Sequence, residues 1–135
     1  MELGFWWTML AFCALIPLLM LGFGRLLYKK PPQDANFLFG YRTARSMKNA
    51  DTWAFAQRTV GRLWWRAGLV LLPLTVVGML ICLFTLARDE DTVGFYSIAF
   101  LYTQMAILIL SILPVERALR RAFDEDGNRR ENTEK

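Results

Sequence analysis

The chain contains no histidine and only two cysteines, and three long stretches of it carry no charged side chain. The absence of histidine removes the residue that most often serves as a general base or metal ligand. Cys13 and Cys82 lie at different depths of apolar stretches, so we expect them to be packing residues without a disulfide. Because no serine or cysteine has an evident base beside it, the sequence predicts no enzyme activity, catalytic residue, cofactor or metal site.

The uncharged stretches are residues 3–24, 67–87 and 92–115, each 21 to 24 residues long. A helix rises about 1.5 Å per residue, so about 20 residues cross a hydrocarbon core of about 30 Å. The sequence therefore predicts an all-α integral membrane protein with three transmembrane helices, and the lipid bilayer as its first partner. We place the membrane domain at residues 1–118 and a charged cytoplasmic tail at residues 119–135, mostly disordered beyond Phe123.

Basic residues are concentrated in the connection between the first two stretches. Nine Lys or Arg and only two acidic residues lie between positions 25 and 66, whereas the second connection, Arg88-Asp89-Glu90-Asp91, is short and net acidic. Positive charge stays on the cytoplasmic side of a membrane. We therefore expect a bacterial plasma membrane protein with its N-terminus outside and its long loop and C-terminus in the cytoplasm.

Each uncharged stretch contains one proline, and the third also contains a strongly polar residue. Pro17 and Pro73 can bend their helices, and Pro114, near the cytoplasmic end of the third stretch, marks a stop or kink. An amide in hydrocarbon needs a partner, so we expect Gln104 to bond across the helices. No carboxylate or lysine lies within the stretches, so the sequence does not favour a proton-coupled transporter.

The connection before the second span has an amphipathic pattern from position 51 to 66, with Asn49 or Asp51 as its N-cap. One arc of this predicted helix carries Trp53, Ala56, Gln57, Val60 and Trp64, and the opposite side carries Arg58, Arg62 and Arg66. We expect an interfacial helix that lies on the inner leaflet or against the bundle before the chain enters the membrane.

A turn of unusual composition precedes that helix. Gly40 permits a backbone conformation closed to other residues. Arg42 and Arg45 present fork-shaped donors suited to phosphate or carboxylate, and the sequence leaves open whether a lipid phosphate or a structural carboxylate is the partner. Small polar residues that favour turns and caps accompany them, namely Thr43, Ser46 and Asn49.

Residues 36–62 together form a motif loop that resembles the signature of the SdpI family, the bacterial immunity proteins against a sporulation-delaying toxin and their relatives. The resemblance covers roughly positions 36 to 115. The residues that carry it are Asn36, Gly40, Tyr41, Arg42, Thr43, Arg45, Ser46, Asn49, Trp53, Ala56, Gln57, Gly61 and Arg62. In that family the motif sits in the cytoplasmic loop before a pair of transmembrane helices, so the resemblance implies that these residues bind a partner or hold the loop.

The resemblance also implies a role in toxin resistance, or in signalling by holding a cytoplasmic repressor at the membrane. The partner expected on this basis is a peptide toxin or a cytoplasmic regulator, bound through Arg42, Arg45, Trp53 and Gln57. The alternative is an oligomeric transporter or channel component, and a homo-oligomer is compatible with either reading. No nucleic-acid partner is predicted.

Overall fold

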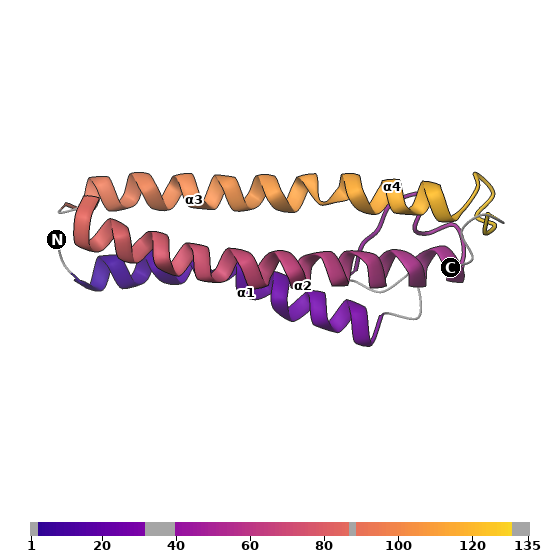
Figure 1. Ribbon diagram of the computed structural model, residues 1–135, viewed down its shortest axis with the longest axis horizontal. Helices are drawn as coiled ribbons and strands as arrows, with labels where there is room; N and C mark the ends of the chain where they lie inside the picture. The colour runs from indigo at the N-terminus through magenta and orange to yellow at the C-terminus, as the bar shows by residue number, and fades with distance from the viewer. Residues whose placement is uncertain (1–2, 32–39, 87–88, 131–135) are drawn as a thin grey trace.

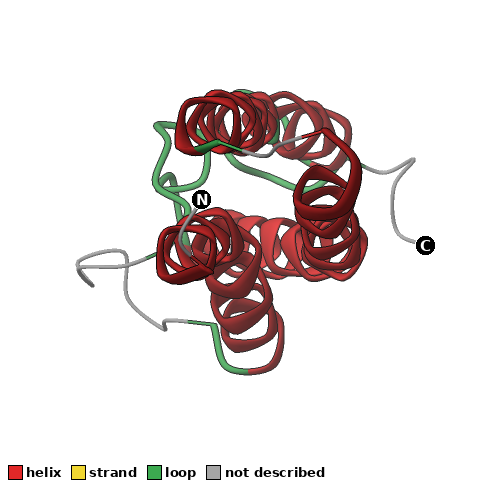
Figure 2. Cartoon of the chain, turned by 90° about the vertical axis from the view of Figure 1, so that its left-hand side faces the viewer, coloured by secondary structure: helices red, strands yellow, loops and turns green. Residues whose placement is uncertain are grey.

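The protein is an elongated helical bundle in a computed structural model that describes residues 3–31, 40–86 and 89–130. Its helices are α1 (Leu3–Lys29), α2 (Ala50–Ile81), α3 (Glu90–Leu110) and α4 (Ile112–Ala122), and a π-helical turn, η1 (Cys82–Leu86), continues α2. Figure 1 shows α3 and α4 in line along one side of the bundle and α1 and α2 along the other. Viewed along the long axis, the helices surround a common centre and do not form one flat layer (Figure 2).

The three predicted spans are confirmed as helices. The segments long and apolar enough to cross a membrane are Leu3–Lys29, Ala50–Phe84 and Glu90–Ala122. Each of these helices is longer than its uncharged stretch and extends at one or both ends into charged residues. The extension is expected, because a hydrogen-bonded helix propagates easily once it is nucleated. The all-α class is also confirmed, since the described residues contain no strand, only an isolated bridge between Phe123 and Arg129.

The amphipathic segment predicted before the second span is helical, but it is not a separate helix. It forms the first half of α2, which runs unbroken for 32 residues from Ala50 to Ile81. The helix continues because no proline lies between Arg58 and the start of the apolar run at Ala67. Gly68 costs only about 1 kcal/mol in a helix interior. In this half of α2, Trp53 and Gln57 are buried, whereas the arginines at positions 58, 62 and 66 are exposed.

The third span is interrupted near its C-terminal end, as Pro114 predicts. α3 ends at Leu110, Ser111 forms a turn, and α4 begins at Ile112. Proline has no backbone N–H to donate to the carbonyl four residues earlier and its ring crowds that carbonyl. Ser111 stabilises the break, because its hydroxyl accepts a hydrogen bond from the indole of Trp64 at 3.1 Å.

Two clusters of buried side chains hold the bundle together. One, near the N-terminus of α1, contains Trp6, Cys13, Met79, Cys82 and Val93. Both cysteines are free and buried, which confirms their packing role. The other cluster lies towards the opposite end and contains Leu27, Tyr41, Ala56, Val60, Val115, Leu119, Ala122 and Phe123.

Gln104 is buried between the helices, as predicted. Its amide nitrogen donates to the backbone carbonyl of Cys13 at 2.9 Å and to the hydroxyl oxygen of Thr75 at 2.8 Å. These bonds connect α3 to both other spans. The remaining amide oxygen has no hydrogen-bond partner among the described residues.

Candidate functional site

The part of the motif loop that the structure describes before α2, residues 40–49, packs against the first half of α2 and against α4. In Figure 1 it is the magenta connection that rises from α2 towards α4. The glycine, hydroxyl, amide and aromatic residues of the sequence motif meet here. Asn36, the first predicted site residue, lies outside the described residues.

The side chain of Gln57 fixes the start of this loop. Its amide oxygen accepts from the backbone N–H of Tyr41 at 2.7 Å, and its amide nitrogen donates to the carbonyl of the same residue at 2.7 Å. Gln57 is fully buried, so water does not compete for either bond. One side-chain amide thus pairs with both backbone groups of one residue, as a neighbouring strand would.

Gly40 is needed for that pairing. Its φ is 123°, in the region that favours glycine. A Cβ at this position would stand 2.9 Å from the amide oxygen of Gln57 and 3.4 Å from the ring of Trp53. Backbone conformation and space therefore both require glycine here.

Glu116 in α4 is the polar centre of the site. Its Oε1 accepts from the hydroxyl of Tyr41 at 2.7 Å and from that of Thr43 at 2.6 Å, and its Oε2 lies 3.6 Å from Nε of Arg45. Burial raises the pKa of the Tyr41 phenol, and the hydrogen bond to Glu116 raises it further. The phenol therefore stays a proton donor over the physiological pH range.

Of the two partners left open for the arginines, Arg45 has a structural carboxylate, Glu116. Arg42 is exposed and lies at the edge of a cavity shared with Trp64 and the α3–α4 break. The sequence patterns did not single out Glu116. The available signal was its position, because it is the first charged residue after the third uncharged stretch.

Ser46 closes the loop on itself. Its hydroxyl oxygen accepts from the backbone N–H of Thr43 at 2.8 Å and lies 3.2 Å from the carbonyl of Tyr41.

Asn49 then begins α2 as its N-cap, as predicted. Its side-chain oxygen accepts from the N–H of Thr52 at 2.8 Å, while the Thr52 hydroxyl accepts from the N–H of Asn49 at 3.0 Å. This reciprocal pair is a capping box.

The residues after α4 fold back onto this cap, so the expectation of disorder beyond Phe123 is wrong for positions 124–130. The amide of Asn49 donates to the carbonyl of Gly127 at 2.8 Å. The guanidinium of Arg129 makes two bonds of 2.8 Å to the carboxylate of Asp51, which raises the pKa of Arg129. The turn forms because Asp124 accepts from two backbone N–H groups, and low hydrophobicity alone did not reveal these polar contacts.

The predicted site residues therefore divide by exposure. Tyr41, Ser46, Trp53, Gln57 and Gly61 are buried, Gly40, Thr43 and Arg45 are half-buried, and Arg42 and Asn49 are exposed. Trp53 and Gln57 accordingly help to hold the loop against α2. Within the described ranges, no group of three Cys, Asp or Glu side chains is arranged to hold a metal ion.

Gly61 belongs to a different contact, the crossing of α1 and α2. A Cβ on Gly61 would stand 2.6 Å from the carbonyl oxygen of Gly24, and one on Gly24 would stand 2.8 Å from that of Gly61. The two helix backbones touch here without intervening side chains. This crossing fixes where α1 ends relative to the motif loop.

Comparison with known proteins gives one family. The sequence matches the family model described as the SdpI/YfhL protein family over residues 33–115, which includes the motif loop, α2 and α3. No curated protein and no solved structure matches the chain.

Proposed function

Because the chain belongs to the SdpI/YfhL protein family and is a small membrane protein of the SdpI type, we propose that its motif loop docks a cytoplasmic regulatory protein at the membrane. The observation that carries this proposal is the locked geometry of residues 40–49. Hydrogen bonds from Gln57 of α2 and Glu116 of α4 hold the loop on the side that faces the bundle. The order of the loop is thus already established before any partner binds, which lowers the entropic cost of association.

The surface that this loop presents is basic with an apolar residue. Arg42 and Met47 are exposed, and Arg45 is half-buried beside Glu116. An exposed methionine adapts its shape to a partner, and arginine is enriched at protein interfaces. We expect the partner to offer an acidic segment with an apolar side chain.

The proposed cytoplasmic location is supported by the excess of basic residues in the loop, which favours an N-terminus outside the bacterial plasma membrane and a C-terminus inside. In that orientation a cytoplasmic regulator reaches the loop directly, whereas a peptide toxin arriving from outside first meets the opposite end. Trp7 and Phe95 are exposed at that end. Toxin binding would therefore involve different residues from regulator binding.

An oligomeric transporter or channel component has less support. Its path would need a row of polar groups across the membrane, and within the uncharged stretches of the described spans Gln104 is the strongest polar side chain that is buried. The amide nitrogen of Gln104 is already bonded to Cys13 and Thr75. It therefore serves packing between the helices.

A photo-crosslinking amino acid at Met47 tests the docking proposal in native membranes. We expect a crosslink to one identified cytoplasmic protein, lost when Arg42→Glu is added, while the same probe at lipid-facing Tyr102 gives none. Crosslinks that survive Arg42→Glu unchanged would contradict docking on the loop. A crosslink to a small peptide from Phe95 alone would support the toxin reading instead.

A further inference from the structure

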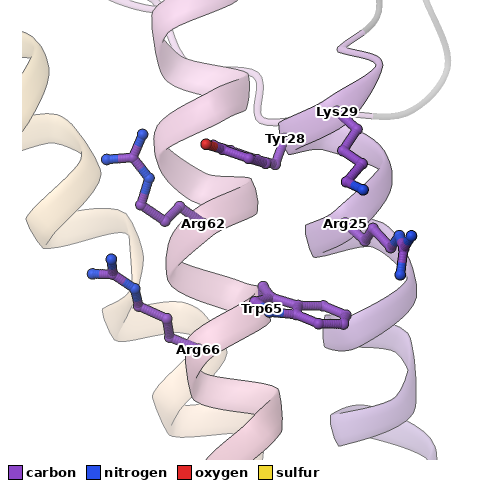
Figure 3. A pocket seen from close by; sticks show the side chains of 6 residues that line it. All are labelled: Arg25, Tyr28, Lys29, Arg62, Trp65 and Arg66. Atoms are coloured by element: carbon purple, nitrogen blue, oxygen red, sulfur yellow. The ribbon is translucent and has the colours of Figure 1, made fainter.

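A basic pocket of about 330 Å³ opens between the end of α1 and the middle of α2 (Figure 3). Its lining consists of four cations and two aromatic rings: Arg25, Tyr28 and Lys29 from α1, and Arg62, Trp65 and Arg66 from α2. Arg62, the last residue of the motif, is part of this lining, but the pocket lies apart from residues 40–49 and includes neither Gln57 nor Glu116, which hold them. The function proposed above makes no use of it.

The glycine crossing creates this pocket. A Cβ on Gly61 would stand 2.6 Å from the backbone nitrogen of Tyr28, and one on Gly24 would stand 2.7 Å from that of Trp65. With the backbones this close, each aromatic side chain reaches across to the other helix. Figure 3 shows the Tyr28 ring in front of α2 and the Trp65 ring in front of α1.

Each ring in turn orients an arginine of the opposite helix. The guanidinium carbon of Arg62 lies 5.3 Å from the centre of the Tyr28 ring, and that of Arg25 lies 6.0 Å from the centre of the Trp65 ring. Stacking on a ring uses the face of a guanidinium and leaves its N–H edge able to donate. Two pre-positioned sets of donors result.

The pocket carries a concentrated positive charge. Across the residues that the structure describes, none of its four basic side chains is paired with a carboxylate, since the ion pairs there join Arg45 to Glu116 and Arg129 to Asp51. Arg62 and Arg66 extend to one side of the two rings, and Arg25 and Lys29 lie on the other (Figure 3). Like charges gathered without a counter-ion favour an anionic ligand.

The depth of the pocket identifies the source of that anion. The first uncharged stretch ends at Gly24, directly before Arg25, and the second begins at Ala67, directly after Arg66. The four cations therefore lie where the hydrocarbon region meets the headgroups. On the hydrocarbon side the helices offer an exposed Leu69 and open space beside Gly22, which suits an acyl chain.

We propose that this pocket binds the headgroup of an anionic phospholipid, with Arg25 and Arg62, one on each side of the two rings, as its main cations. Arginine forks match phosphate oxygens in geometry, and basic pockets between transmembrane helices hold such headgroups. Lys29 and Arg66 add charge at its margin. A lipid in this position would bridge α1 and α2 and so stabilise their crossing.

Native mass spectrometry of the full chain in neutral detergent, titrated with phosphatidylglycerol or phosphatidylcholine, tests the proposal. We expect preferential retention of phosphatidylglycerol, weakened about tenfold in Arg25→Gln/Arg62→Gln. The matched control is Lys30→Gln/Arg58→Gln, which removes two charges outside the pocket and should change affinity less than about twofold. Arg25→Lys/Arg62→Lys keeps the charge without the planar fork and should give an intermediate loss, which covers the case in which the glutamine variant does not fold.

Three results would overturn the proposal. Equal weakening by the control pair would mean that net charge attracts the lipid without a site. Equal retention of both lipids would mean that the headgroup charge is not recognised. Competition by millimolar inorganic phosphate without any lipid preference would identify a soluble anion as the ligand.

Discussion

The side-chain amide of Gln57 pairs with both the backbone N–H and the carbonyl of Tyr41, each at 2.7 Å. This contact ties α2 to a loop sixteen positions earlier in the chain. A buried backbone group that loses its partner costs about 1–3 kcal/mol. The contact is therefore an energetic anchor of the motif loop.

Gln57→Leu removes both bonds at once. We expect a loss of about 2–4 kcal/mol in stability and faster tryptic cleavage at Arg42 and Arg45. Gln57→Glu keeps an acceptor for the Tyr41 N–H but loses the donor, so its effect should be of similar sign. Thermal unfolding in detergent and limited proteolysis measure the two effects. An unchanged cleavage rate in both variants would show that the loop is held by other contacts.

Glu116→Gln tests the polar centre of the site. The hydroxyls of Tyr41 and Thr43 both donate to one carboxylate oxygen, and the neutral amide accepts more weakly than the carboxylate. We expect destabilisation of about 2 kcal/mol by thermal unfolding. Glu125→Gln removes an exposed carboxylate from the turn after α4 and should be nearly neutral. Similar losses in the two variants would point to net charge, not to the site.

The titration of Tyr41 should reveal its burial. Burial raises the pKa of this phenol above its ordinary value, and Glu116 adds to the shift. Because the folded-state pKa is raised, the associated stability is fully present below about pH 10 and is lost as pH rises through the raised pKa. Tyrosinate absorbance in the folded protein should show one late component that Tyr41→Phe removes. If Tyr41→Phe instead removed a component at the ordinary pKa of tyrosine, the Tyr41 phenol would be exposed in solution.

The sequence predicted the elements of this fold well, because each depends on a local pattern. Uncharged length gave the spans, the spacing of Trp53 and Gln57 gave the buried face of α2, and Pro114 gave the break before α4. Hydrogen-bonding need alone predicted that Gln104 faces the bundle. Such features require no knowledge of which helices are neighbours.

The pairing of elements was not predictable in the same way. Glu116 lies more than seventy positions from Tyr41 and carries no local mark of a partner. The same holds for Arg129 and Asp51, whose bond orders a segment that its composition alone described as a solvated tail. Whether Arg45 meets a lipid phosphate or a structural carboxylate likewise depended on the fold.

The crossing of α1 and α2 gives a sharp steric prediction. Gly61→Ala would place a methyl group 2.6 Å from the carbonyl oxygen of Gly24, so the helices must separate. We expect a loss of about 1–3 kcal/mol from overpacking, with weaker lipid retention in the basic pocket. Gly22→Ala is the matched control, because its added Cβ meets nothing within 4 Å, and it should be neutral or slightly stabilising. Equal tolerance of both changes would mean that the backbones are further apart.

Orientation in the membrane gives the last prediction. The excess of basic residues on the side of the motif loop predicts that Met47 faces the cytoplasm and Asp91 the outside. Both positions are exposed, so cysteines placed there should be reactive, whereas the native Cys13 and Cys82 are buried and should contribute little background. A membrane-impermeant maleimide added to intact cells should label Asp91→Cys, and Met47→Cys should react only after permeabilisation. The opposite order would place the motif loop outside, where a cytoplasmic regulator could not reach it, and the docking proposal would then fail together with the topology. The lipid pocket would survive that result, because it requires only an interface depth and not a particular side of the membrane.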